Sequence, residues 1–191
     1  MTEHDDLPAA ARTRRLEERL IAAGLTSDEE IDEFLTRLYA SASPVNGARM
    51  VARAWTDPQY RDLLLSDGNA AAAQAGFDGL SYQLRVVANT GQTHNVIVCT
   101  LCSCYPVSLL GPSPGWYKSF PYRSRTVREP RSVLAEFGVS LPGSVQISVW
   151  DSTSEARYMV LPVRPAGTGA LDAGKLAALV TRNGLIGTAL V

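Results

Sequence analysis

The most informative segment of this chain is Val98-Cys99-Thr100-Leu101-Cys102-Ser103-Cys104. All three cysteines of the 191-residue chain lie within this one segment. Such a concentration indicates a site, because cysteines that merely fill a core are scattered along a sequence. An alternating, strand-like run precedes the segment, so we expect Cys99 to leave the end of a β-strand, a rigid support for a site.

The spacing of Cys102, Ser103 and Cys104 predicts an unusual metal site. A metal held by both sulfurs is pressed against the backbone between them, so the amide nitrogens of Ser103 and Cys104 become ligands in five- and six-membered rings. Cys99 can add an axial thiolate, which gives an S₃N₂ donor set with a sixth position open. Thiolates and deprotonated amides suit trivalent cobalt or iron better than zinc, which prefers four side chains in a tetrahedron.

Two plainer interpretations of the cysteines stay open. Three thiols could form part of a zinc site completed by His94 or by a partner, although two cysteines separated by one residue fit a tetrahedron poorly. A disulfide with one free thiol is the second alternative, but residues 102 and 104 are too close for comfortable bridging. On a strand, His94 and Cys99 face opposite sides, so we expect a surface or interface histidine. His4 lies in the tail, and no hydrolase triad is supported.

Composition limits the function further. The chain is 46% hydrophobic and 19% charged with a net charge of −1, which predicts a globular protein without affinity for nucleic acid or a membrane. No apolar run reaches the roughly 18 residues of a membrane helix. The N-terminus is acidic and lacks the features of a signal peptide, so we expect a cytoplasmic location.

Residues 1–43 are predicted to form a helical arm preceded by a loose tail at residues 1–10. Helical spacing of apolar residues predicts one helix from Ala11 to Ala23. A second helix is expected after Ser27, with Glu30 at the capping-box position. The two helices have few hydrophobic residues of their own. We therefore expect the arm to pack on a partner subunit, with a hairpin lying on its own domain as the alternative.

Residues 44–191 are predicted to form an α+β domain, in which a layered β-sheet core is covered by helices. A turn at residues 44–47 should lead into a helix over residues 48–55, and Asp57-Pro58 should start another. The period then changes from 3.6 to 2, which predicts a hairpin of strands 82–88 and 94–98. Later elements are expected at 115–119 (helix start), 129–137 (helix), 145–150 and 157–161 (strands), 172–182 (helix) and 185–191 (apolar tail). The basic run at residues 122–131 should pair with carboxylates of a partner, with phosphate binding as the alternative.

The residues 99–106, Cys-Thr-Leu-Cys-Ser-Cys-Tyr-Pro, resemble the metal-binding motif of the nitrile hydratase α subunit. Thr100 and Tyr105 resemble the cobalt type of that family. The resemblance extends over residues 44–188. Its other specific parts lie at residues 46–49, 52–58, 116–118, 122–123, 127–131, 157–162 and 164–168.

This resemblance implies roles for the cysteine segment. Cys99 would stay a thiolate, Cys102 would be oxidised to sulfinic acid and Cys104 to sulfenic acid. The nitrogens of Ser103 and Cys104 would complete the ligands of cobalt(III), with iron(III) as the alternative. Hydration of a nitrile to the amide would take place there, with the Cys104 sulfenate oxygen as candidate nucleophile or base. Glu155 and Arg157 would orient the site, or else form a plain cross-strand ion pair.

The resemblance also implies partners. A β subunit, as one chain or two split chains, would be required for activity and would supply arginines to the oxidised cysteines. A cobalt-delivering activator protein is a further expected partner. The runner-up function is the metal-bearing subunit of thiocyanate hydrolase, and a non-catalytic zinc or redox-sensing module is the alternative from another class.

One departure from the family concerns the substrate pocket. The family usually carries Trp-Pro where this chain has Val107-Ser108, immediately after the metal-binding motif. Loss of an indole beside the open coordination position would widen the pocket at Val107. We therefore expect a bulky substrate, such as an aromatic or heterocyclic nitrile.

Overall fold

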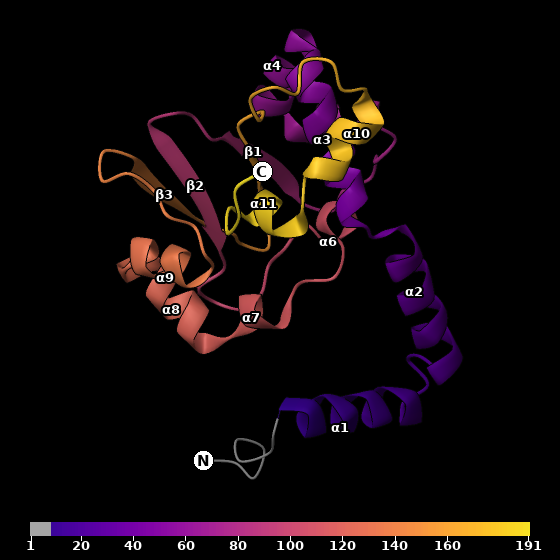
Figure 1. Ribbon diagram of the computed structural model, residues 1–191. Helices are drawn as coiled ribbons and strands as arrows, with labels where there is room; N and C mark the ends of the chain where they lie inside the picture. The colour runs from indigo at the N-terminus through magenta and orange to yellow at the C-terminus, as the bar shows by residue number, and fades with distance from the viewer. Residues whose placement is uncertain (1–8) are drawn as a thin grey trace. The chain divides into compact units, whose positions relative to one another are not determined.

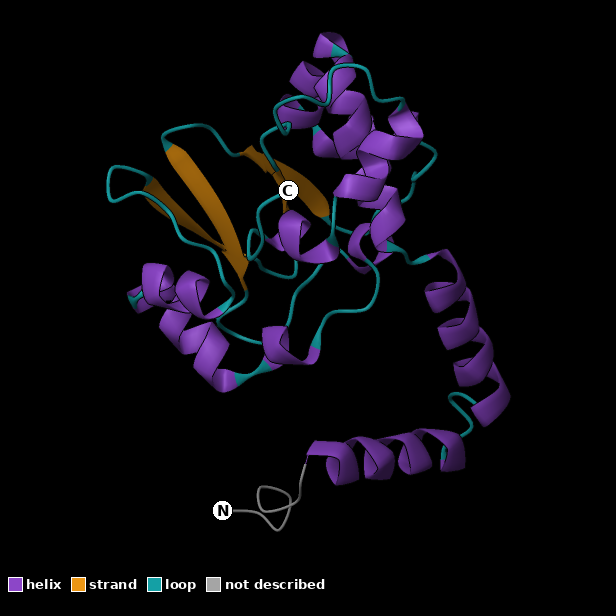
Figure 2. Cartoon of the chain, in the orientation of Figure 1, coloured by secondary structure: helices purple, strands orange, loops and turns teal. Residues whose placement is uncertain are grey.

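The computed structural model describes residues 9–191, which combine helices with two small sheets (Figure 2). The chain divides into two compact units, the first ending at Ser41 and the second spanning Ala42–Val191. His4 and most of the predicted tail lie outside the described residues. Among the described residues, no helix is long and apolar enough to cross a membrane.

The first unit consists of α1 (Ala9–Ala22) and α2 (Asp28–Ser41), as predicted (Figure 1). α1 includes residues 9 and 10, so the expectation of a loose tail up to residue 10 was wrong there. The capping box at the start of α2 is confirmed. The Glu30 nitrogen donates to Ser27 Oγ at 3.2 Å, and the Ser27 nitrogen donates to Glu30 Oε2 at 3.0 Å.

The second unit contains the remaining helices and four strands (Figure 1). The helices are α3 (Pro44–Thr56), α4 (Pro58–Ser66), α5 (Gly68–Gln74), α6 (Val107–Leu110), α7 (Gly115–Lys118), α8 (Phe120–Arg128), α9 (Pro130–Glu136), α10 (Ala173–Leu179) and α11 (Arg182–Ile186), and the strands are β1 (Gln83–Ala88), β2 (Thr93–Val98), β3 (Gln146–Asp151) and β4 (Ala156–Leu161). α4 and α5 pack on β1, α8 on β2, α9 on β3 and α11 on β4. The predicted α+β class, with strands covered by helices, is confirmed.

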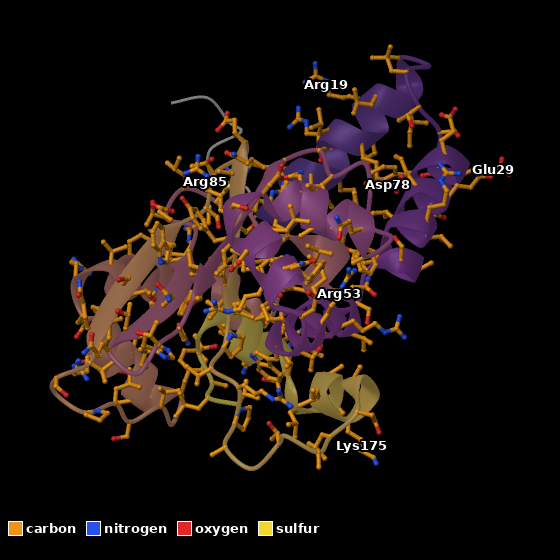
Figure 3. All side chains as sticks on the ribbon, turned by 90° about the horizontal axis from the view of Figure 1, so that it is seen from above. Arg19, Glu29, Arg53, Asp78, Arg85 and Lys175 are labelled. Atoms are coloured by element: carbon orange, nitrogen blue, oxygen red, sulfur yellow. The ribbon has the colours of Figure 1, made fainter. Side chains whose placement is uncertain are left out.

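The start of the second unit corrects one expected turn. Residues 44–47 are the first turn of α3, because Ser43 caps the helix by accepting from the Val45 nitrogen and Pro44 occupies the first helical position. The predicted start of α4 is confirmed, since Asp57 accepts from the Tyr60 nitrogen and Pro58 follows. The guanidinium of Arg53, labelled in Figure 3, lies 4.0 Å from the centre of the Tyr60 ring.

The predicted hairpin of residues 82–88 and 94–98 was wrong. β1 pairs in parallel with β4, and β2 pairs in parallel with β3. Alternation fixes the period of a strand but not its partner. Near the turn, the Asn95 backbone nitrogen donates to Asn89 Oδ1 at 2.8 Å, so this nitrogen is not available for a backbone hydrogen bond to β1.

The prediction for His94 was also wrong, since this side chain is buried within its own chain. Residues 94–98 of β2 are all buried, as in parallel strands covered on both faces, and His94 is only 3% exposed. Its Nε2 lies 2.7 Å from the carbonyl oxygen of Gly187. Nε2 therefore carries the proton, and Nδ1 accepts from the Asn89 amide at 3.4 Å.

The last helix is divided in two. The chain leaves α10 at Val180, and Thr181 starts α11 by accepting from the Gly184 nitrogen. The expected single helix over residues 172–182 was therefore wrong at its end. Leu185 and Ile186, expected in a tail, belong to α11 and are fully buried.

Candidate metal centre

The three cysteines come together on the loop that follows β2, as the sequence predicts for Cys99. Their sulfur atoms all lie within 4.8 Å of one another. Cys99 Sγ is 3.6 Å from Cys102 Sγ, which is 3.3 Å from Cys104 Sγ. Cys99 is fully buried in the core, Cys104 is half-buried and Cys102 is exposed. The site thus has a rigid floor and an open face.

The backbone of the loop turns toward the same point. The Cys102 nitrogen donates to Cys99 Sγ at 3.3 Å. Hydrogen bonding from Cys104, then from the Ser103 backbone, lowers the pKa of the Cys102 thiol. Burial, followed by the hydrogen bond with Cys102, raises the pKa of Cys104 to about 12. Cys102 therefore loses its proton before Cys104 does, and the Cys104 thiol donates a hydrogen bond to the Cys102 sulfur.

These observations test whether the donor set fits a metal ion. Three sulfurs converge, and hydrogen bonding from the backbone amides of Ser103 and Cys104 contributes to the lowered pKa of the Cys102 thiol. The arrangement suits a thiolate–amide metal centre. His94 is not part of the group, because its Nε2 is committed to Gly187.

The loop is anchored at one end by a residue that sequence reasoning missed. Asp151, the last residue of β3, accepts from the Thr100 nitrogen at 2.9 Å and from Thr100 Oγ1 at 2.5 Å. The parallel register places Asp151 opposite Val98, directly before the cysteines. Because the sequence interpretation paired β2 with β1, it gave no reason to bring Asp151 to the site.

Three side chains hold the carbonyl oxygens of the loop. Tyr117 Oη donates to Cys104 O at 3.0 Å, Arg123 Nη1 to Cys102 O at 3.0 Å, and Arg157 Nη1 to Tyr105 O at 2.7 Å. Tyr117 and Arg123 are residues that the sequence did not single out for the site. Their signal was present in motifs that resemble the family, but those motifs had no assigned role.

The other predicted site residues have different surroundings. Arg157 also stacks on Tyr82, with its Cζ 4.4 Å from the ring centre. The Glu155 carboxylate is exposed and accepts from Thr153 Oγ1 at 3.1 Å. No ion pair joins Glu155 to Arg157 among the residues that the structure describes. Val107 begins α6 and is half-buried, two residues after the anchored Tyr105 carbonyl.

The basic run at residues 122–131 corrects a further expectation. Arg125 pairs with Glu129 and Glu136 of the same chain, with closest distances of 2.6 Å. Arg131 donates to backbone oxygens of the loop after α9. These arginines therefore have partners in their own chain, and the expectation of a partner's carboxylates was wrong for them.

Fold and site together define an α+β chain with a cluster of three thiols that could hold a metal ion at the end of β2. The family model for the nitrile hydratase alpha chain matches residues 8–189. The chain belongs to this family.

Individual relatives agree with the family match. The chain is 47% identical over 182 residues to the low-molecular-weight cobalt-containing nitrile hydratase subunit alpha of Rhodococcus rhodochrous, covering 95% of this chain and 88% of that protein. It is 44% identical over 185 residues to the thiocyanate hydrolase subunit gamma of Thiobacillus thioparus, covering 91% and 76%. Among solved structures, an Fe-type nitrile hydratase double mutant from Comamonas testosteroni Ni1 superposes with a TM-score of 0.87, at 41% identity and 96% and 92% coverage.

Proposed function

We propose that this chain is the metal-bearing α subunit of a cobalt-type nitrile hydratase, which adds water to a nitrile and releases the amide. The observation that carries the proposal is the convergence of three sulfurs within 4.8 Å at the end of β2, in a chain that matches the alpha-chain family from residue 8 to residue 189. Two relatives that are named cobalt-containing, from Rhodococcus rhodochrous and Pseudonocardia thermophila, support cobalt over iron.

The chain's own atoms have defined roles in this proposal. Cys99, Cys102 and Cys104 hold the metal through sulfur, and Ser103 and Cys104 hold it through their backbone nitrogens. A trivalent cobalt ion bound there supplies Lewis acidity toward a nitrile or a water molecule. The buried Cys99 fixes the floor of the site, while the exposed Cys102 and half-buried Cys104 form the face that substrate reaches.

Oxidation of two cysteines belongs to the same proposal. Cys102 would carry a sulfinate and Cys104 a sulfenate, whose oxygen would act as nucleophile or base toward the substrate. Their greater exposure compared with Cys99 supports this division, because oxidants reach accessible thiolates first. Arg157 would orient the site directly, through its hydrogen bond to the Tyr105 carbonyl oxygen of the cysteine loop, and Glu155 would influence the site from farther away.

A β subunit, as one or two chains, would cover the open face. Leu101 beside the cysteines is 86% exposed, Phe120 at the start of α8 is 73% exposed and Val127 is 51% exposed. Apolar surface of this kind is typical of a protein interface. The arm offers similar surface, since Phe34 is 58% exposed and Leu16 is 56% exposed. An activator protein would deliver cobalt before the subunits assemble.

The substrate is proposed to be a bulky nitrile. Val107 stands where the family usually has tryptophan, and it lies on α6 at the end of the cysteine loop. A smaller side chain there leaves room for an aromatic or heterocyclic ring.

The test is co-expression of this chain with its neighbouring genes in cobalt medium, followed by assay of a nitrile panel. Amide formation by the complex, with almost none by this chain alone, is expected. A cobalt-loaded complex that converts no nitrile would overturn the proposal.

Thiocyanate hydrolysis is the second candidate. It is favoured by the similarity to the thiocyanate hydrolase gamma subunit and by a recombinant thiocyanate hydrolase structure with partially modified cobalt centres, which superposes with a TM-score of 0.85 at 42% identity. Assay of the same complex with thiocyanate separates the two activities.

A further inference from the structure

Arg123 differs from Arg125 of the same helix in what its charge faces. Its Nη1 donates to the carbonyl oxygen of Cys102 at 3.0 Å, whereas Arg125, two residues later, is paired with Glu129 and Glu136. Among residues 9–191, no carboxylate lies within ion-pair distance of Arg123. The positive charge of Arg123 is therefore directed at the cysteine loop.

The carbonyl that Arg123 holds is a specific one. Cys102 O and the Ser103 nitrogen belong to the same peptide group, so the hydrogen bond orients the plane that carries the Ser103 nitrogen. When that nitrogen is a ligand, its proton has gone to solvent and the negative charge is shared with Cys102 O. A guanidinium bonded to this oxygen offsets that charge.

The setting makes the arginine an effective donor. Its side chain is half-buried, and its Nε is enclosed without an acceptor in the described chain, so the guanidinium is partly shielded from water. Charge-assisted hydrogen bonds are stronger in such surroundings than in bulk water. The preceding residue, Tyr122, is 5% exposed and donates to Ile97 O at 2.6 Å, which ties α8 to β2. Arg123 is thus carried by a helix fixed to the strand that presents Cys99.

We propose that Arg123 is a positioning residue of the metal centre, holding the Cys102–Ser103 peptide so that the Ser103 nitrogen faces the metal and offsetting the negative charge of the donor set. The proposal rests on the function given above, because it requires that a metal binds the cysteine loop. It assigns to this chain, and not only to a partner subunit, an arginine that acts on the site.

The test uses the full-length chain co-expressed with its partner genes in cobalt medium. Variants are Arg123→Gln, which removes the charge, and Arg123→Lys, which keeps it. Arg182→Gln is the matched control, because Arg182 Nη1 also donates to a backbone oxygen, that of Pro112 at 2.9 Å, and its Nε is likewise enclosed without a partner. The readouts are cobalt retained against a chelator and the energy of the sulfur-to-cobalt absorption band.

Loss of a residue that orients metal ligands typically weakens metal binding about 10- to 100-fold. We expect cobalt loss in this range for Arg123→Gln, a smaller loss for Arg123→Lys and less than about a threefold change for Arg182→Gln. The cobalt that Arg123→Gln retains should absorb at lower energy, because its ligands are more electron-rich. A merely structural role would leave the band unchanged.

The outcomes distinguish this proposal from the function on which it rests. Absence of cobalt from the wild-type chain would defeat the proposed function. A wild-type chain that binds cobalt, with an Arg123→Gln variant that matches it in retention and in band energy, would overturn the positioning role alone. If Arg123→Gln does not fold, Arg123→Met, which also removes the charge and the donor, decides by the same readouts: a band at lower energy with weaker retention upholds the role, and a wild-type band with wild-type retention overturns it.

Discussion

Gly187 connects the C-terminal helix to β2, the strand that leads into the cysteine loop, and its replacement by alanine should be severely destabilising. The residue ends α11 with a φ of +90°, and its carbonyl oxygen accepts the hydrogen bond of His94 on β2. A Cβ atom at this position would lie 2.0 Å from Asn95 O and 3.0 Å from the Val96 Cα. Both atoms belong to the backbone of β2, so a side-chain rotation cannot relieve the contact.

The loss in the free energy of unfolding caused by Gly187→Ala is the sum of three contributions. The left-handed backbone costs about 1–2 kcal/mol for a residue with a Cβ. Forcing α11 away from β2 adds about 1–3 kcal/mol of overpacking. Loss of the His94 hydrogen bond adds about 1 kcal/mol. The total of roughly 3–6 kcal/mol is a large part of the 5–15 kcal/mol by which a typical protein is stable.

Gly138→Ala is the matched control. Gly138 has a φ of +81°, but nothing lies within 4 Å of a Cβ built there, so only the cost of the left-handed backbone, about 1–2 kcal/mol, is expected. The assay is urea unfolding of each full-length variant, with the free energy extrapolated to water. Equal losses of stability in the two variants would refute the argument that the close approach of α11 to β2 is what requires glycine.

Three further predictions concern the site and its support. Burial lowers the pKa of His94 from its usual 6.5, so the unfolded chain takes up a proton before the folded chain as the pH falls, and the free energy of unfolding should decline below about pH 6.5. His94→Gln should lessen this decline, measured by urea unfolding between pH 7 and 5, and an unchanged decline would contradict the prediction. Asp151→Asn removes the charge that holds Thr100 and should lower cobalt retention about 10-fold, measured as cobalt per chain after chelator treatment. Retention equal to that of the wild type would argue against a role of Asp151 in anchoring the cysteine loop. Val107→Trp should lower kcat/KM for an aromatic nitrile about 10-fold or more relative to a small aliphatic nitrile, and an unchanged ratio would exclude Val107 from substrate selection.

The parts of the fold that follow from local chemistry were predictable from the sequence. The capping box of Ser27 and Glu30 and the Asp57-Pro58 helix start need only neighbouring residues, and both are present. The cysteine group is equally local, because its three sulfurs lie within six positions of the chain. Side chains so close in sequence meet with little dependence on the rest of the fold.

Features that depend on strand partners were not predictable in this way. The alternation in residues 82–88 and 94–98 is equally compatible with a hairpin and with two separate sheets of parallel strands. The actual pairing of β1 with β4 and of β2 with β3 was therefore not predicted. The wrong strand pairing also affected the predicted site, because Asp151 reaches Thr100 only when β3 lies beside β2. His94 was misplaced for the same reason, since only a strand covered on both faces buries it.

Arg123 shows how a local pattern can conceal a long-range role. In the sequence it is one of several arginines on a basic run, and such runs usually face solvent or a partner. In the structure its neighbour Arg125 has intrachain carboxylates, and Arg123 reaches back 21 positions to Cys102. The two arginines differ because residues two positions apart on a helix point in nearly opposite directions, about 200° apart around its axis.

Metal analysis combined with the intact mass of this chain, taken from the complex assembled in cobalt medium, tests the central claim most directly. The account predicts one cobalt ion per chain and the mass of three added oxygen atoms, two on Cys102 and one on Cys104, with Cys99 unmodified. Zinc bound to three unmodified thiols would contradict the hydratase centre and would favour a zinc-binding or redox-sensing module.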